Sequence, residues 1–149
     1  MIRKFESFSF KWIKEAKTED FLEYKKKETS KWLLRAQNMG FRFPIFKDEE
    51  DFKLSLKNSP VINLDDLRSE VHHMTSIKDM NQLRKLVGLY QRPRDIDRII
   101  EGIQTGASIP MPIILKGQKG LFIMAGNTRQ NVAYILGVPI EAILIDVTK

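Results

Sequence analysis

The chain has 149 residues, of which 42% are hydrophobic and 30% charged, and this balance predicts one compact domain rather than a disordered chain. It contains no cysteine, which excludes disulfides, cysteine-ligated metals and thiol catalysis. The formal net charge of +6 favours anionic partners such as nucleic acid or nucleotides.

Residues 8–58 carry helical patterns rich in charge. A helix is predicted to begin at Thr18–Asp20, where a capping residue precedes two acids, and to end at Gly40. Residues 41–46 alternate in hydrophobicity, which predicts either a short strand or an extended packing segment. Asp48 can begin a further short helix.

Two features of this half resemble nucleic-acid contacts but have simpler interpretations. The run Lys25–Lys27 is interpreted as a solvated helix face rather than a binding patch, because Glu23 and Glu28 flank it. Trp12 and Trp32 lie at helical spacings from other apolar residues, and we interpret them as core side chains rather than base-stacking platforms.

Residues 63–73 predict a short helix, and residues 76–88 predict another with an apolar face. His72 and His73 are adjacent, so they cannot share one helical face as a metal-binding pair would. We therefore expect no metal site there.

The second half predicts a helix, two strands, a helix and a strand. Isoleucines at i, i+3, i+4 and i+7 mark a helix over 96–103. Strands over 113–115 and 121–125 flank a glycine turn. A helix over 128–136 and an apolar strand over 138–147 follow, and the strand has the pattern of a central one. This order predicts an α+β fold.

The best candidate site is the turn Gly126-Asn127-Thr128-Arg129 between a strand and a helix. The start of a helix offers unpaired N–H groups and the positive end of a dipole, which suit a phosphate or carboxylate. Asn127 and Gln130 could instead form a capping box. Capping does not explain Arg129, because the dipole disfavours a cation there and the residue is in phase with the buried face. We expect it to have an anionic partner.

A second basic group consists of Gln91, Arg92 and Arg94, stiffened by Pro93. It predicts either a phosphate-binding motif or a solvent-exposed basic loop. Over residues 84–129 there are eight basic and three acidic side chains, so an excess of positive charge surrounds the candidate turn.

Residues 89–147 resemble the ParB/sulfiredoxin-like superfamily, in particular the ParB N-terminal or "ParB-like nuclease" domain. The resemblance rests on the order of basic motif, isoleucine-striped helix, strand, hairpin, Gly-x-x-Arg turn, helix and apolar strand. It implies a small mixed sheet with packed helices, with residues 76–149 as this domain and residues 1–75 as a helical N-terminal extension packed on it.

The resemblance also implies a pocket for a nucleoside triphosphate, CTP or ATP, with Mg²⁺ in the ParB proteins. The residues that it places at the phosphates or along the pocket are Gly126, Asn127, Thr128, Arg129, Gln91, Arg92 and Arg94. Asn127 stands where sulfiredoxins have their catalytic cysteine and where partitioning ParB proteins usually have a metal-side glutamate. Sulfiredoxin chemistry is therefore excluded, and the carboxylate near the metal is missing.

The Ala-Gly-Asn-Thr-Arg form is similar to short stand-alone ParB-like proteins of bacteriophages, some described as nucleases and others implicated in transferring groups to modified DNA bases. We therefore expect a nucleotide- or DNA-phosphate-binding domain in phage DNA metabolism, acting in modification, cleavage or nucleotide hydrolysis. The alternative is a non-catalytic DNA- or protein-binding module of the same fold, in which the turn could be a helix cap alone.

The residues do not decide whether the domain is an enzyme, because no catalytic group stands out. The nearby carboxylates are Asp95, Asp97 and Asp146, and the first two are better explained as helix-start residues than as a base or metal ligands. No apolar run approaches the roughly 20 residues of a membrane span, and residues 1–7 lack the core of a secretory signal. We expect a cytoplasmic protein, in the host cytoplasm if phage-encoded, either monomeric or homodimeric.

Overall fold

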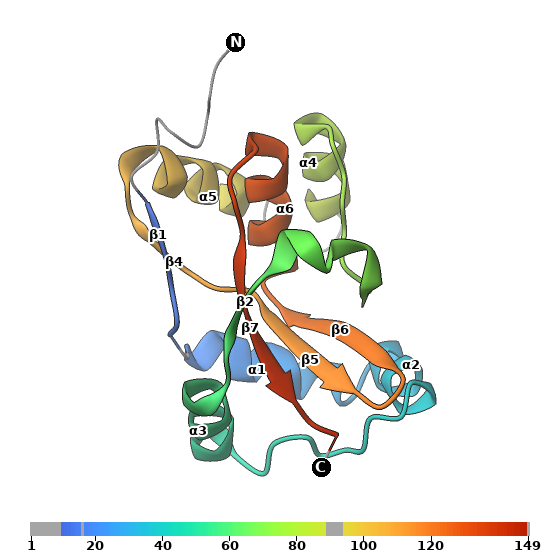
Figure 1. Cartoon of the computed structure of the whole chain (residues 1–149). Coiled ribbons are helices and arrows are strands. Elements are labelled where there is room, and N and C mark those ends of the chain that lie inside the picture. The colour runs from blue at the N-terminus through green and yellow to red at the C-terminus, as the bar shows by residue number, and fades with distance from the viewer. Residues whose placement is uncertain (1–9, 16, 89–93, 149) are drawn as a thin grey trace.

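A computed structural model of the chain has an α+β fold, as the sequence predicts (Figure 1). It describes residues 10–15, 17–88 and 94–148, without the side chains of Arg94 and Asp95. The helices are α1 (Thr18–Lys27), α2 (Lys31–Asn38), α3 (Glu49–Asn58), α4 (Met80–Gly88), α5 (Arg94–Thr105) and α6 (Asn127–Leu136). The strands are β1 (Lys11–Ile13), β2 (Val61–Asn63), β3 (Val71–His72), β4 (Ser108–Pro110), β5 (Ile113–Gly117), β6 (Gly120–Ala125) and β7 (Glu141–Asp146). None of the helices in these ranges is both long and apolar enough to cross a bilayer.

A five-stranded mixed sheet forms the middle layer, in the order β2-β7-β5-β6-β3. The β7–β5 and β6–β3 pairs are parallel, and the β2–β7 and β5–β6 pairs are antiparallel. The prediction that the last strand is central is confirmed, because β7 lies between β2 and β5. β1 and β4 pair in parallel as a separate ribbon.

The strands bury side chains on both faces because successive residues point to opposite sides. Ile113 and Leu115 of β5 pack in one cluster with α1, α2 and α3, together with Phe122 of β6. Ile114 of β5 and Ile123 of β6 pack in the other cluster, with α4, α5 and α6. Figure 1 shows these two groups of helices on either side of the sheet.

The N-terminal half differs from its prediction in three places. The helix predicted to run to Gly40 is broken after α1, and Ser30 caps α2 by accepting the N–H of Trp32. The helix predicted over 63–73 is instead two 3-10 turns followed by β3. Both edge strands of the sheet, β2 and β3, come from this half, so the sheet crosses the boundary predicted at residue 75.

Two interpretations of side chains in this half are confirmed. The lysine run is a paired helix face, with Lys25 at 2.8 Å from Glu28 and Lys27 at 3.8 Å from Glu23. Both tryptophans pack against the hydrophobic core. The charge of this run is therefore partly balanced within α1.

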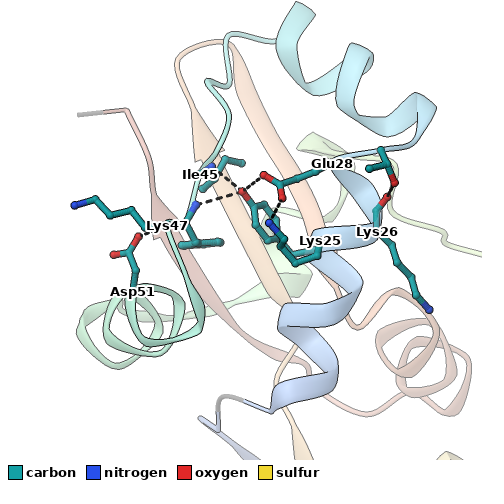
Figure 2. Close-up of polar contacts among 9 residues, drawn as sticks. Lys25, Lys26, Glu28, Ile45, Lys47 and Asp51 are labelled. Atoms are coloured by element: carbon teal, nitrogen blue, oxygen red, sulfur yellow. Dashed lines mark hydrogen bonds and ion pairs between the residues drawn. The ribbon is translucent and has the colours of Figure 1, made fainter.

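The hydroxyl of Tyr24 fastens α1 to the extended segment before α3 (Figure 2). It accepts the backbone N–H of Ile45 at 2.7 Å and of Phe46 at 3.2 Å, and it donates to Glu28 at 3.0 Å. Burial raises the pKa of Tyr24 to about 12, so the hydroxyl keeps the proton that it donates. At the end of the same segment, Asp51 accepts the N–H of Lys47 at 2.9 Å.

Tyr24→Phe is expected to lower the free energy of unfolding by about 1–3 kcal/mol, because it leaves two backbone N–H groups without their acceptor. Urea unfolding measures the loss. Tyr134→Phe is the matched control, since the ring of Tyr134 and not its hydroxyl carries the contact with Arg68. The control is expected to change stability by less than about 0.5 kcal/mol. Equal effects of the two substitutions would show that the Tyr24 hydroxyl is not an anchor.

Candidate functional site

The predicted turn lies where β6 ends and α6 begins, at the end of the sheet from which β5 and β7 start. The β5–β6 pairing slips at this end, because Ile113 faces Ala125 while Ile114 faces Ile123. Such an irregularity bends a strand and redirects the chain beyond it. Gly126 then turns the chain with a left-handed φ of 86° and serves as the N-cap of α6.

Gly126 is held between two neighbours that leave no room for a side chain. A Cβ atom there would lie 2.8 Å from the Cα of Pro112 and 2.9 Å from Cζ of Arg129. The guanidinium of Arg129 therefore folds back across the glycine instead of extending into solvent. Glycine is required here both for its backbone conformation and for this close approach.

Arg129 has partners in β4, in the connection from β4 to β5, and in α1. Its Nε donates to the carbonyl of Pro110 at 2.8 Å, and its Nη2 donates to the carbonyl of Met111 at 3.1 Å. The anionic partner expected for Arg129 is Asp20 of α1, whose Oδ1 lies 3.5 Å from Nη2. Asp20 is only 5% exposed. This residue was not predicted from the sequence; its position four residues before the buried Tyr24, on one helical face, was the available signal.

The ion pair between Arg129 and Asp20 neutralises each charge only in part. Charge-assisted N–H···O bonds are usually about 2.7–2.9 Å long, so a contact of 3.5 Å is weak. The second oxygen of Asp20, Oδ2, is buried and has no hydrogen-bond partner within the described part of the chain. Burial raises the pKa of Asp20 above its ordinary value despite the opposing charge of Arg129. Arg129 therefore keeps a positive charge that Asp20 only partly neutralises.

Glu23, one helical turn after Asp20, brings a second carboxyl group to the same place. Burial raises its pKa, and the negative charge of Asp20 adds to that rise, whereas the charges of Lys27 and Arg129 oppose it. Two carboxyl groups with raised pKa values thus lie within electrostatic range of Arg129. Groups of this kind hold a proton at a higher pH than ordinary carboxyl groups do.

Asn127 and Gln130 do not form the capping box that was the structural alternative for this turn. The Oδ1 of Asn127 accepts the backbone N–H of Thr75 at 2.9 Å, and its Nδ2 donates to the carbonyl of His73 at 3.1 Å. Gln130 donates to the carbonyl of Thr75 at 2.6 Å. These side chains join α6 to the segment after β3, and the N-cap Gly126 makes no side-chain bond to the helix.

The structure describes only part of the predicted phosphate site as lying together. Gly126, Asn127, Thr128 and Arg129 share the first turn of α6, and Thr128 is half-buried there. Gln91 and Arg92 lie outside the described residues, and Arg94 begins α5 with a side chain that is not described. The phosphate site predicted from these seven residues therefore stays a prediction, with Asp20 and Glu23 as new neighbours.

The other carboxylates considered from the sequence lie elsewhere. Asp97 forms an exposed ion pair with Arg84 at 2.7 Å, which links α5 to α4. Asp146 ends β7 at the opposite end of the sheet. A groove of about 710 Å³ lies at that far end, lined in part by Arg42, Asp51 and Asp146. Within the described ranges, no three histidine, aspartate or glutamate side chains gather closely enough to hold a metal ion.

Comparison of the chain with protein-family models, curated proteins and solved structures finds no match. The role of the site is therefore argued from its geometry. That geometry combines a helix start, a glycine against which the arginine packs, a fixed guanidinium and two protonatable carboxyl groups. Such a set can bind an anion and hold a proton beside it.

Gly126→Ala is expected to destabilise the protein more than Gly137→Ala, which is a matched control. Both glycines have a left-handed φ, 86° and 74°, but a Cβ at Gly137 meets nothing within 4 Å. The control should cost about 1–2 kcal/mol for the backbone conformation alone. Gly126→Ala should cost about 1–3 kcal/mol more, because Pro112 and Arg129 must move. Equal losses in urea unfolding would contradict the tight packing of Arg129 over the turn.

The stability of the wild-type protein is expected to fall relative to Asp20→Asn as the pH rises from about 3 to 7. Burial raises the pKa of Asp20 in the folded state, so the folded protein holds this proton more tightly than the unfolded chain does. The contribution of Asp20 is therefore greatest below its unfolded pKa and is lost as the pH rises through its folded pKa. Urea midpoints of both proteins across this range measure the difference. A relative gain of the wild type with rising pH would mean that Arg129 lowers the pKa instead.

Proposed function

We propose that the first turn of α6 binds a phosphate group of a nucleoside triphosphate, CTP or ATP, or of DNA. The observation that carries this proposal is the incomplete neutralisation of Arg129. Its guanidinium is fixed by two backbone carbonyls, yet its only described carboxylate partner is 3.5 Å away. A fixed cation of this kind gains from a stronger anion such as a phosphate oxygen.

The backbone around Arg129 supports the same ligand. The first N–H groups of a helix and its dipole favour an anion, and Gly126 lets the guanidinium of Arg129 lie against this helix start. The resemblance to ParB/sulfiredoxin-like proteins supports it independently, because it rests on the order of motifs and not on these contacts. By that resemblance the domain would act in phage DNA metabolism.

In this proposal Asp20 competes with the phosphate for Arg129. The carboxylate and the ligand carry the same sign of charge, so a bound phosphate weakens the hold of Arg129 on α1. Asp20 can relieve the repulsion by taking up a proton, since its pKa is already raised by burial. Phosphate binding is therefore coupled to protonation of this side chain.

The carboxyl pair also favours a second candidate function, which is catalysis on the bound phosphate. Asp20 and Glu23 both have raised pKa values and both lie within range of Arg129, as a general acid beside a phosphate site would. The alternative is a module that binds DNA or a protein without turnover. The carboxyl pair makes hydrolysis or group transfer the form to test first.

The proposal predicts opposite effects of two substitutions on nucleotide binding, measured by titration calorimetry with CTP, ATP and inorganic pyrophosphate. Asp20→Asn should tighten binding several-fold, because it removes the competing carboxylate. Adding Arg129→Gln to Asp20→Asn should weaken binding at least about tenfold, since it removes a charged donor without leaving a buried carboxylate unpaired. Thermal melting of each variant establishes that it is folded.

The matched control is Arg84→Gln with Asp97→Asn, which removes a second, exposed Arg–Asp pair with the same change of charge. Binding should be unchanged in this control. If the control and the α6 variants bind alike, the turn is not the phosphate site. Release of phosphate during the same titrations distinguishes an enzyme from a binding module.

A further inference from the structure

A second group of positive charges lies on α2 and the β5–β6 hairpin, at the end of β6 opposite the α6 turn. α2 carries Lys31 and Arg35 one turn apart and contains no acidic residue. Both side chains are exposed, and neither forms an ion pair within the described part of the chain. This helix therefore presents uncompensated positive charge on one face.

The β5–β6 hairpin adds a further cation to this face. Figure 1 shows α2 beside this hairpin. A Cβ placed on Gly40, just after α2, would lie 3.7 Å from Cγ of the exposed Lys119. A Cβ on Gly120 would lie 3.4 Å from the imidazole of His72. Lys119 and His72 are thus neighbours of the end of α2.

The two histidines lie on the same face, over the buried ring of Phe122. The ring of His73 stacks on it with centroids 4.8 Å apart and an interplanar angle of 22°, and that of His72 is tilted at 5.6 Å. Both histidines are exposed, so each imidazole is accessible. Burial lowers the pKa of His73, and the charges of Arg35, His72 and Lys27 lower it further, which places those cations around it.

We infer that this face, made by Lys31, Arg35, Lys119, His72 and His73, binds a single strand of nucleic acid. Three cations that have no ion pair among the described residues suit backbone phosphates, and exposed imidazoles stacked on an aromatic ring suit bases. The face is continuous with the α6 turn, because the carbonyl of His73 accepts a hydrogen bond from Asn127. A strand lying here would bring a phosphate to that turn, and in this respect alone the inference rests on the proposed function.

The acidic residues near this face do not cancel it. Glu23 lies 3.8 Å from Lys27, and Glu28 pairs with Lys25, so both are engaged within α1. Glu70, just before β3, is exposed and is not ion-paired with the cations of the face. The remaining positive charge can attract a polyanion and release its counterions on binding.

The test is the affinity for a fluorescein-labelled oligothymidine of about 12 nucleotides, followed by anisotropy between about 50 and 200 mM salt. The triple variant Lys31→Gln, Arg35→Gln, Lys119→Gln should bind at least about tenfold more weakly. The slope of log affinity against log salt should fall by about two, since each phosphate contact on a single strand contributes about 0.7. His73→Ala should weaken binding without changing that slope.

The control triple variant is Lys47→Gln, Lys53→Gln, Lys57→Gln, which removes the same charge from exposed lysines at and before α3. Its slope should stay close to that of the wild type. Equal losses in the two triple variants would overturn the inference, as would stronger binding to duplex DNA or to anionic vesicles. The Asp20→Asn, Arg129→Gln variant should lower the slope by no more than about 0.7, the share of one phosphate at the α6 turn, against about two for the triple variant on this face. An unchanged slope in the first variant alone would contradict the α6 site, and an unchanged slope in the triple variant would contradict this face.

Discussion

The guanidinium of Arg129 is a polar contact that joins the two helical layers across the end of the sheet. The backbone of Arg129 belongs to the first turn of α6, which packs on one face of the sheet. Its partner Asp20 belongs to α1, on the other face. The remaining bonds of Arg129 reach the last residue of β4 and the connection from β4 to β5. One side chain thus links two layers and the end of the sheet, in a part of the molecule where a buried charge must be partnered.

This contact places a cation at the end of a helix that disfavours it, and the structure offsets that cost only in part. Two carbonyls orient the guanidinium but carry no full charge, and the single carboxylate is distant and costly to ionise. A ligand with more negative charge than Asp20 therefore changes the balance between α1 and α6. Any anion that binds at the turn is energetically linked to how firmly α1 is held, and the linkage is reciprocal.

The regular elements around the site could be predicted because their patterns are local. The isoleucine stripe of α5, the apolar runs of β5 to β7 and the glycines at 126 and 137 each act through neighbours in sequence. β1, β2 and β3 could not be predicted, since they have only two or three residues and exist through pairing with distant strands. Asp20 and Arg129 are 109 residues apart, so their contact depends on the whole fold. The partners of Asn127 could not be predicted for the same reason. Its side chain is suited to capping a helix, but it bonds the backbone of the distant residues His73 and Thr75.

The position of β7 has a consequence for how the molecule is made. It is the last of the described strands along the chain, yet it lies between β2, near residue 62, and β5. During synthesis the strands on its two sides emerge first and have no common partner until residues 141–146 leave the ribosome. The edge of β5 that pairs with β7 stays unpaired until then, which favours slow assembly of the sheet.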